Sequence, residues 1–204
     1  ITEEPPAEEV KAAMNHKFQN LLLDIQQSAK SVQVLPSDSA VKEETFAAIA
    51  LRPESLLEAI LSNTGGIVID DWLRLYGCGE LSFLQRNRLC PIREIVVGED
   101  ILGGLFLCLE GGSMGYFAPD TLEVEDMDIG LGQFVHWCLH GDTDTFYMDY
   151  RWDNWREDCA QLTLDQGMGF YPFLWTEAGQ GRTRRPLPMA EIIGLEFDFL
   201  RQMS

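Results

Sequence analysis

The stretch of residues 64–79, T-G-G-I-V-I-D-D-W-L-R-L-Y-G-C-G, limits most strongly what this chain can fold into. Glycines stand at both ends of an apolar run that only Asp70, Asp71 and Arg74 interrupt with charge. Branched apolar residues of this kind fill buried sheets. The pattern therefore predicts one or two buried strands over residues 64–76, with Trp72 packed inside. Charged groups in such a run are costly unless each has a partner, so the same stretch is a candidate site.

The rest of the chain indicates an α+β fold with a central antiparallel sheet flanked by N-terminal and C-terminal helices. Apolar spacing and capping residues predict helices over residues 10–29, 39–50, 55–62 and 131–140, two short helical turns after Asp142, and a last helix from Pro188. Alternation and turns predict strands over residues 32–35, 94–97, 105–109, 114–118 and 121–124. Three segments read as loops or irregular structure: residues 81–93, 167–175 and 179–185. We expect a disordered acidic tail over residues 1–9 and a single domain over residues 10–204.

Composition narrows the class of protein. The chain of 204 residues is 46% hydrophobic, enough for one sizeable core. No apolar run approaches the roughly 20 residues that span a bilayer, so no membrane association is expected. Five cysteines without a C-x-x-C pair favour a reducing compartment, and we expect a cytoplasmic protein. The start at Ile1 rather than Met leaves export open.

The charge is strongly acidic and unevenly distributed. Of the net charge of -18, residues 94–150 contribute -12, with twelve Asp or Glu and no Lys or Arg. Such a surface repels nucleic acid, so none is expected as a partner. It serves either solubility or the attraction of a basic protein partner. We expect four clustered carboxylates to face solvent, and three arginines of the 179–185 loop could neutralise part of the cluster: Glu123, Glu125, Asp126 and Asp128, with Arg182, Arg184 and Arg185.

Two motifs resemble catalytic or metal-binding patterns. Residues 111–115 match G-x-S-x-G, but Y-F-A-P follows, so we expect a hairpin and not a nucleophile elbow. His136 and His140 share a helix face, and Asp142 or Asp144 could add a third metal ligand. Trp137 stands where zincins have Glu, so we predict a polar helix face with no metal and no cofactor.

The remaining candidates form a polar and aromatic set. Asp70 or Asp71 could meet Arg74 or Arg151 in a buried ion pair, or line a polar pocket beside Trp72. The aromatic residues of the 141–155 stretch could line a ligand groove, anchor a partner or simply pack between helices and sheet. The candidate binding residues are Asp70, Trp72, Arg74, Asp142, Tyr147, Arg151, Trp152 and Trp155.

A series of short motifs carries a family resemblance over about residues 30–204. They are V-L-P at 34–36, T-G-G-I-V-I-D at 64–70, W-L-R-L-Y-G-C-G at 72–79, G-E-D-I-L-G-G-L-F at 98–106, Y-F-A-P-D-T-L-E at 116–123, G-D at 141–142, F-Y at 146–147, R-W-D-N-W at 151–155, D-Q-G at 165–167, F-Y-P-F-L-W at 170–175 and R-P-L-P-M-A-E at 185–191. Together they resemble a bacterial family known only as a domain of unknown function. That family is distantly similar to the SUKH superfamily of Smi/Knr-type α+β proteins. The chain departs from the family pattern before Trp72, where only Asp71 stands in place of a histidine and a glycine.

The resemblance implies a SUKH-like fold and a regulatory or immunity-type binding role. From it and from the charge we expect a non-enzymatic binding protein whose acidic surface meets a basic protein partner. The alternatives are a hydrolase or a small-ligand-binding protein that uses a polar pocket around Asp70, Arg74 and Asp142, the histidine pair or the aromatic layer. Nothing in the sequence indicates an oligomeric state.

Overall fold

A computed structural model describes residues 7–178 and 181–203, with side chains described from His16 onward. The expected tail over residues 1–9 falls mostly outside these ranges, and the first helix begins at Ala7. The helices are α1 Ala7–Gln27, α2 Ser39–Ala48, α3 Leu56–Asn63, α4 Phe83–Leu89, α5 Leu131–His140, α6 Thr143–Phe146, α7 Trp155–Cys159 and α8 Met189–Met203. The strands are β1 Val32–Leu35, β2 Gly66–Ile69, β3 Leu73–Tyr76, β4 Ile95–Asp100, β5 Leu105–Cys108, β6 Met114–Phe117, β7 Val124–Asp126, β8 Gln166–Tyr171 and β9 Thr183–Pro188.

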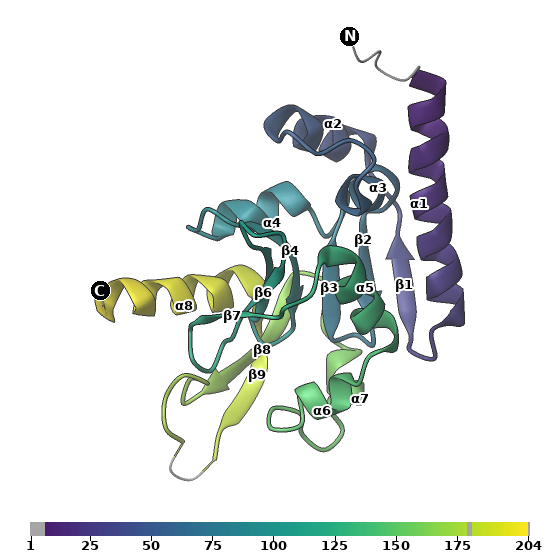
Figure 1. Cartoon of the computed structure of the whole chain (residues 1–204). Coiled ribbons are helices and arrows are strands. Elements are labelled where there is room, and N and C mark those ends of the chain that lie inside the picture. Colours follow the sequence, from purple (N-terminus) through teal and green to yellow (C-terminus); the bar gives the residue numbers. More distant parts are fainter. Residues whose placement is uncertain (1–6, 179–180, 204) are drawn as a thin grey trace.

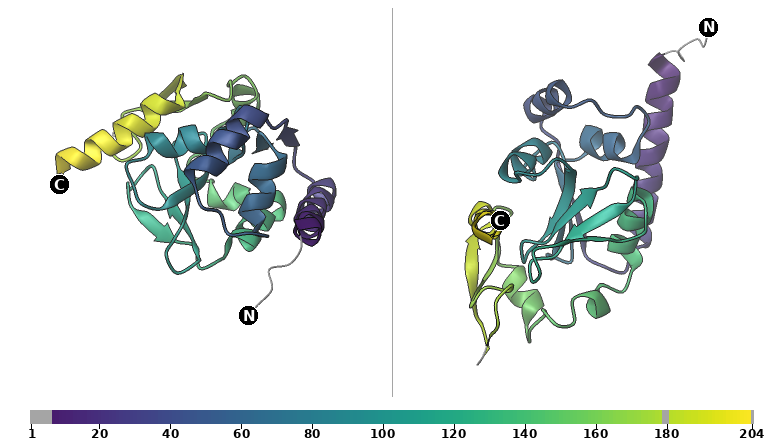
Figure 2. Two further views of the ribbon diagram at one scale, coloured as in Figure 1. Left: turned by 90° about the horizontal axis from the view of Figure 1, so that it is seen from above. Right: turned by 60° about the vertical axis from the view of Figure 1, so that its left-hand side comes forward.

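A seven-stranded antiparallel sheet forms the centre of the molecule and confirms the α+β prediction. Its strands lie in sequence order from β1 to β7, so every neighbour along the chain is also a neighbour in the sheet. The strands β8 and β9 form a separate antiparallel hairpin. Figure 1 shows α2, α3 and α4 above the sheet and the hairpin below it. The views in Figure 2 place α1 and α8 on opposite sides of the molecule.

Alternate residues along each strand build two hydrophobic cores, one on each face of the sheet. On the first face, Leu73, Leu75 and Phe106 pack with residues of α1, α3 and α5. On the second face, Leu105 and Leu107 pack with residues of α4 and α8. Because side chains alternate between faces, a buried charge on one strand faces either one core or the other, and this decides which polar groups can meet.

The glycines around β2 and β3 allow the chain to pack closely there. A Cβ on Gly77 would lie 2.3 Å from the backbone nitrogen of Gly66 and 2.5 Å from the carbonyl oxygen of Thr64. A Cβ on Gly79 would lie 2.5 Å from Cα of Gly65. No side chain fits at these distances, so glycine is required at both positions, directly after β3.

Some local predictions were wrong. Residues 81–93 contain α4, whose first turn is capped by Ser82 and whose Phe83 and Leu84 are buried. The polar run of Arg86, Asn87 and Arg88 hid this helix from the sequence pattern. The predicted irregular and loop segments at 167–175 and 179–185 contain β8 and the start of β9.

The boundaries of two elements also differ from the sequence-based expectation. The last strand of the sheet, β7, covers residues 124–126 instead of 121–124. The last helix, α8, begins at Met189 and not at Pro188; its Ile192 is buried, whereas Met203 is 63% exposed because the end of the helix extends beyond the sheet. None of the helices in the described part of the chain is both long and apolar enough to cross a membrane.

Replacing Leu73 with Ala should lower the free energy of unfolding by about 2–5 kcal/mol, the range for a buried leucine. Leu73 is 2% exposed and belongs to the core on the first face of the sheet. Denaturant unfolding monitored by circular dichroism measures the effect. An unchanged midpoint would show that Leu73 is not in the core.

Candidate functional site

Asp70 and Asp71 form the turn between β2 and β3 and do not lie on opposite faces of a strand. Both have positive φ, 53° and 54°, and the Trp72 N–H donates to the Ile69 carbonyl oxygen at 3.0 Å. These are the marks of a type I′ hairpin turn, which aspartate tolerates. The Asp70 carboxylate accepts a hydrogen bond from the Ser31 N–H at 3.1 Å and lies 3.7 Å from the Arg156 guanidinium. The expected buried pair between an aspartate here and Arg74 or Arg151 is therefore wrong.

The aromatic residues of the sequence prediction form one packed cluster on the first face. Trp72 is fully buried, as expected, with its ring centroid 5.1 Å from Tyr147, 5.1 Å from Trp155 and 5.9 Å from Trp152. The Arg151 guanidinium lies 4.7 Å from the Trp72 ring and 4.0 Å from the Trp155 ring, and it pairs with Asp144. The structure thus brings five of the eight candidate residues together. Since Trp72 and Tyr147 are both buried, the cluster supports the fold and these two rings do not offer an exposed anchor.

Arg74 lies on the opposite face of the sheet, away from Asp70 and Asp142. It lies 3.4 Å from Glu99 Oε1 and donates to the carbonyl oxygens of Thr163, Leu164 and Gln166. Glu99 is fully buried as well, and it completes a network with two further groups. Arg86 Nε lies 3.3 Å from Glu99 Oε2, and the Tyr76 hydroxyl donates to the same oxygen at 2.7 Å. This network connects β3, β4 and α4 to residues 163–166.

Asp142 caps α6, as the sequence predicted. Its carboxylate accepts hydrogen bonds from the Thr145 N–H at 2.9 Å and the Thr145 hydroxyl at 2.6 Å. These bonds lower the pKa of the Asp142 carboxyl group. Asp142 and Asp70 do line one open cleft, together with Lys30, Asp144 and Arg156. A carboxyl group with a lowered pKa has no proton to donate near neutral pH and is a weak base, so Asp142 is poorly suited to general acid or base catalysis.

Asp100 is a buried carboxyl group that the sequence analysis missed. It accepts hydrogen bonds from the hydroxyls of Tyr116 at 2.7 Å and Tyr147 at 2.9 Å, and from the N–H groups of Leu102 and Gly104 at 2.9 Å each. Burial nevertheless raises the pKa of the Asp100 carboxyl group. The turn-rich sequence G-E-D-I-L-G-G signalled the bend that Asp100 closes, but not the two distant tyrosines.

His136 and His140 meet Asp24 of α1, a residue that the sequence analysis did not consider. His136 Nδ1 lies 3.3 Å from Asp24 Oδ2, and His140 Nε2 lies 2.8 Å from Asp24 Oδ1. The ligand atoms of these three residues all lie within 4.8 Å of one another. The expected third ligand, Asp142 or Asp144, is not part of this group. Three ligands could hold a metal with an open position, whereas structural zinc sites have four protein ligands.

We expect this group to act as a hydrogen-bonded contact between α1 and α5 and to hold no structural zinc. The Asp24 carboxylate already contacts both imidazoles, and none of the described histidine, cysteine, aspartate or glutamate side chains joins them as a fourth ligand. Elemental analysis of protein purified without a histidine tag should therefore find no stoichiometric zinc. One equivalent of zinc that disappears in His136→Ala would contradict this expectation.

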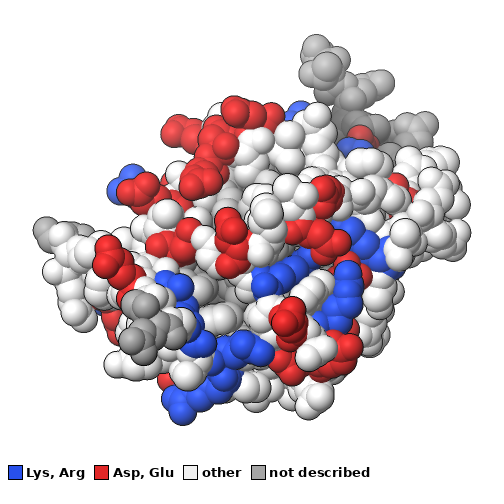
Figure 3. Space-filling view, turned by 90° about the horizontal axis from the view of Figure 1, so that it is seen from below, with Lys and Arg blue, Asp and Glu red and all other residues white. Residues whose placement is uncertain are grey.

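The acidic cluster lies on β7 and the turns beside it. Glu123, Glu125, Asp126 and Asp128 are all exposed, as predicted. None of the three arginines that could have neutralised them forms an ion pair with the cluster among the described residues: Arg182 donates to the carbonyl oxygens of Leu174 and Thr176, Arg184 pairs with Asp158, and no ion pair includes Arg185. Figure 3 shows acidic side chains grouped at the upper left of one face, whereas the basic side chains at the bottom and right lie beside further acidic ones.

A family model covers almost the whole described chain. It matches residues 8–192 and is described as the protein of unknown function DUF2625. The chain belongs to this family. Membership confirms the resemblance that the short motifs carried, but the DUF2625 family supplies no activity, substrate or partner that could be transferred to this chain.

Two bacterial relatives of this DUF2625 chain have also been described only as uncharacterized. YbfG of Escherichia coli K12 is 32% identical over 195 residues, which covers 88% of each chain. A protein of Haemophilus influenzae is 28% identical over 163 residues, which covers 70% of each chain. No solved structure matches the chain. The distant similarity to the SUKH superfamily remains a prediction.

Proposed function

We propose that this protein is a non-enzymatic binding module that takes up an extended basic segment of a protein partner along β7. The observation that carries the proposal is that β7 combines an unpaired strand edge with uncompensated acidic side chains. A regulatory or immunity-type role, which the SUKH-like resemblance implies, would use this same surface.

The backbone of β7 supports strand addition. β7 is the last strand of the sheet, so one of its edges has no neighbouring strand within residues 7–178 and 181–203. The Ala118 N–H donates to the Glu123 carbonyl oxygen, and the Met127 N–H donates to that of Met114. Hydrogen-bonded and non-hydrogen-bonded pairs alternate in an antiparallel ladder, so the N–H and C=O groups of Val124 and Asp126 point away from β6. A partner segment can add as an eighth strand through these groups.

The side chains of β7 support a basic partner. Glu123, Glu125, Asp126 and Asp128 take part in none of the ion pairs among the described residues. Charged side chains on an edge strand also discourage pairing between copies of one chain. A complementary charge on a partner removes that barrier and raises the association rate.

An exposed aromatic residue near the edge could anchor the partner. Of the aromatic residues of the 141–155 stretch that could anchor a partner, Tyr147 does not suit this role because it is 1% exposed. Phe146 is 40% exposed and its ring centroid lies 5.3 Å from that of Tyr116, which is paired with Glu125 of β7. Phe146 therefore offers an apolar contact one strand away from the acidic edge.

The hydrolase alternative has less support. Asp70 and Asp142 share the open cleft with Lys30, but Arg74 lies on the other face of the sheet and cannot join them. The pKa of Asp142 is lowered by its cap and not raised toward the working range of a general acid.

Charge neutralisation tests the electrostatic part of the proposal. The triple variant Glu123→Gln, Glu125→Gln and Asp126→Asn should lose most of the partner in pull-downs from the native cytoplasm, and its association rate should fall by about tenfold. Wild-type binding should weaken between low and physiological ionic strength, about 0.15 M. The matched control removes three exposed carboxylates elsewhere, through Glu43→Gln, Asp153→Asn and Glu157→Gln. If both triple variants retain the partner equally and binding does not depend on salt, the acidic side chains of β7 do not attract the partner.

A single proline tests the strand edge itself. Val124→Pro removes an N–H that points away from β6, so the sheet should keep its own ladder while the partner loses a hydrogen bond and meets the proline ring. Full binding by this variant would mean that charge alone attracts the partner and that no eighth strand forms.

A further inference from the structure

Three side chains that commonly bind metals meet on the surface between α1 and α5. Asp24 comes from the C-terminal part of α1, and His136 and His140 lie four residues apart on α5. Among the described histidine, cysteine, aspartate and glutamate side chains, this is the one group of three whose ligand atoms all lie within 4.8 Å of one another. The sequence pattern offers no suitable third ligand near the two histidines, and the packing of α1 supplies it.

The distances between the ligand atoms suit a bound ion. A first-row metal ion binds imidazole nitrogen and carboxylate oxygen at about 2.0–2.2 Å, so its ligand atoms lie about 3–4 Å from one another. His136 Nδ1 lies 3.3 Å from Asp24 Oδ2, and His140 Nε2 lies 2.8 Å from Asp24 Oδ1. A neutral imidazole can carry its one proton on either ring nitrogen, so the nitrogen that faces Asp24 can be the unprotonated one. Coordination then replaces the two hydrogen bonds to Asp24 and requires only small shifts of the side chains.

Contacts between the two helices hold the ligands in place. Leu21 of α1 and Leu139 of α5 are buried in the same hydrophobic core. Just beyond α1, the Ser28 hydroxyl donates to the Leu139 carbonyl oxygen at 2.5 Å, and Lys30 Nζ donates to the carbonyl oxygen of Cys138 at 2.9 Å. Ligands that are already in place lose little freedom on binding, which favours affinity.

The group is also accessible and carries an unneutralised charge. The side chains of His136, His140 and Asp24 are 65%, 24% and 30% exposed, so an ion can enter from solvent and keep water at its remaining positions. None of the described lysines or arginines forms an ion pair with Asp24. The Asp24 carboxylate can therefore balance part of the charge of a cation.

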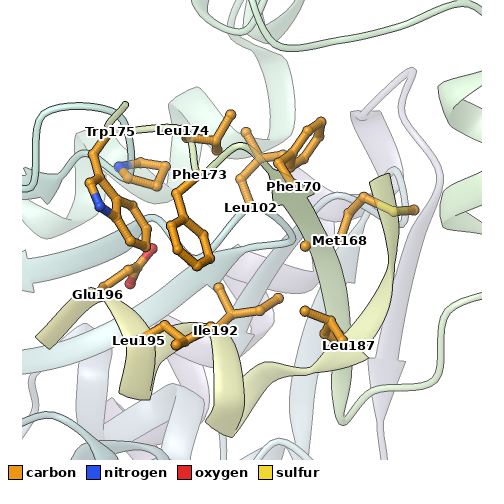
Figure 4. A pocket seen from close by; sticks show the side chains of 12 residues that line it. Leu102, Met168, Phe170, Phe173, Leu174, Trp175, Leu187, Ile192, Leu195 and Glu196 are labelled. Carbon is orange, nitrogen blue, oxygen red and sulfur yellow. The ribbon is translucent and has the colours of Figure 1, made fainter. Parts of the chain in front are cut away.

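The pocket between α8 and the β8–β9 hairpin offers no comparable set of ligands (Figure 4). Its walls are mainly apolar and aromatic, and its one carboxyl group, that of Glu196, is fully buried. None of the described residues that line this pocket is a histidine or a cysteine. A metal ion would find one carboxyl group there, against two imidazoles and a carboxylate between α1 and α5.

We propose that Asp24, His136 and His140 form a labile site for a divalent transition-metal ion, which links α1 to α5 when it is bound. Two imidazoles and one carboxylate suit Co²⁺, Ni²⁺, Cu²⁺ and Zn²⁺, whereas Mg²⁺ and Ca²⁺ prefer oxygen ligands alone. With three protein ligands and open positions, the ion exchanges with solvent, so protein purified without added metal still holds no stoichiometric zinc. The site is independent of the acidic edge of β7.

Titration of tag-free protein with nickel chloride tests the proposal, after dialysis against a chelator and then against metal-free buffer. Calorimetry should show one Ni²⁺ bound per chain, and Tm should rise with the Ni²⁺ concentration because the ion binds the folded state. Magnesium chloride at the same concentrations should have neither effect. If Ni²⁺ does not bind, or if Mg²⁺ binds equally well, the proposal is wrong.

Single substitutions identify the ligands. His136→Ala and Asp24→Asn should each weaken Ni²⁺ binding by at least about tenfold, the lower limit even for groups that only orient a ligand, and should abolish the rise in Tm. His16→Ala is the matched control and should bind Ni²⁺ like the wild-type protein, because His16 is the one remaining histidine of the chain and is exposed on α1. Loss of binding in His16→Ala would place the ion elsewhere. Full binding by Asp24→Asn would place it on the histidine pair alone, with no link to α1, and either result would overturn the proposal.

Discussion

Replacing Glu99 with Ala should lower the free energy of unfolding by about 3–5 kcal/mol. Glu99 is fully buried and faces two buried guanidinium groups, with Arg74 at 3.4 Å and Arg86 at 3.3 Å. Its removal leaves both positive charges in the interior and also removes the acceptor of the Tyr76 hydroxyl. An uncompensated buried charge costs far more than the pair contributes, so the loss should be large even though the pair itself adds little net stability.

Urea unfolding monitored by tryptophan fluorescence measures this loss. Glu94→Ala is the control: Glu94 is exposed just before β4, and its removal should change the free energy of unfolding by no more than about 0.5 kcal/mol. If the two variants unfold at the same urea concentration, the Glu99 network does not hold β3, β4 and α4 together.

Replacing Trp72 with Ala should also lower the free energy of unfolding by about 3–5 kcal/mol, the range for a buried aromatic residue. Trp72 has no exposed surface, and three aromatic rings and the Arg151 guanidinium surround its indole. Its Nε1 has no hydrogen-bond partner among the described residues, so the loss comes from packing and from the cavity that the change leaves. Thermal unfolding followed by circular dichroism should show a lower Tm.

A matched aromatic residue on the surface provides the control for Trp72. Tyr171 is 70% exposed on β8, and Tyr171→Ala should be close to neutral. A Trp72→Ala variant as stable as Tyr171→Ala would mean that the aromatic cluster is loosely packed and open to a ligand.

The sheet could be predicted from local sequence because each strand pairs with the strand beside it in sequence. Short turns with typical turn residues join these neighbouring strands. Asp70 and Asp71 connect β2 to β3, and residues 111–113 lie between β5 and β6. The G-x-S-x-G segment forms the hairpin turn that was expected, with Ser113 between β5 and β6. In contrast, α4 was missed because one of its two arginines points into the protein: Arg86 faces Glu99, whereas Arg88 is exposed and pairs with Glu44. The number of polar residues does not distinguish a solvent-exposed loop from a helix whose charged side chains form ion pairs inside the protein.

The candidate site shows a different limit of sequence reasoning. Residues close in sequence, such as Tyr147, Arg151 and Trp155, do meet around Trp72. Partners far apart in sequence could not be assigned. Glu99 was not considered for Arg74, nor Asp24 for His136 and His140, because the register and the helix packing that bring them together are set by the whole fold. Glu196 looked like an ordinary helix residue, and only its burial distinguishes it.

Amide hydrogen exchange on the complex with the captured partner tests the central claim most directly. In the free protein the amides of Val124 and Asp126 face the open edge of β7 and should exchange quickly. In the complex these two amides should become protected, because they donate to the added strand, and Val124→Pro should abolish the complex. Protection that appears only in the cleft around Asp70 and Asp142, with residues 124–126 unchanged, would contradict the proposal. The partner would then bind at that cleft and not along β7.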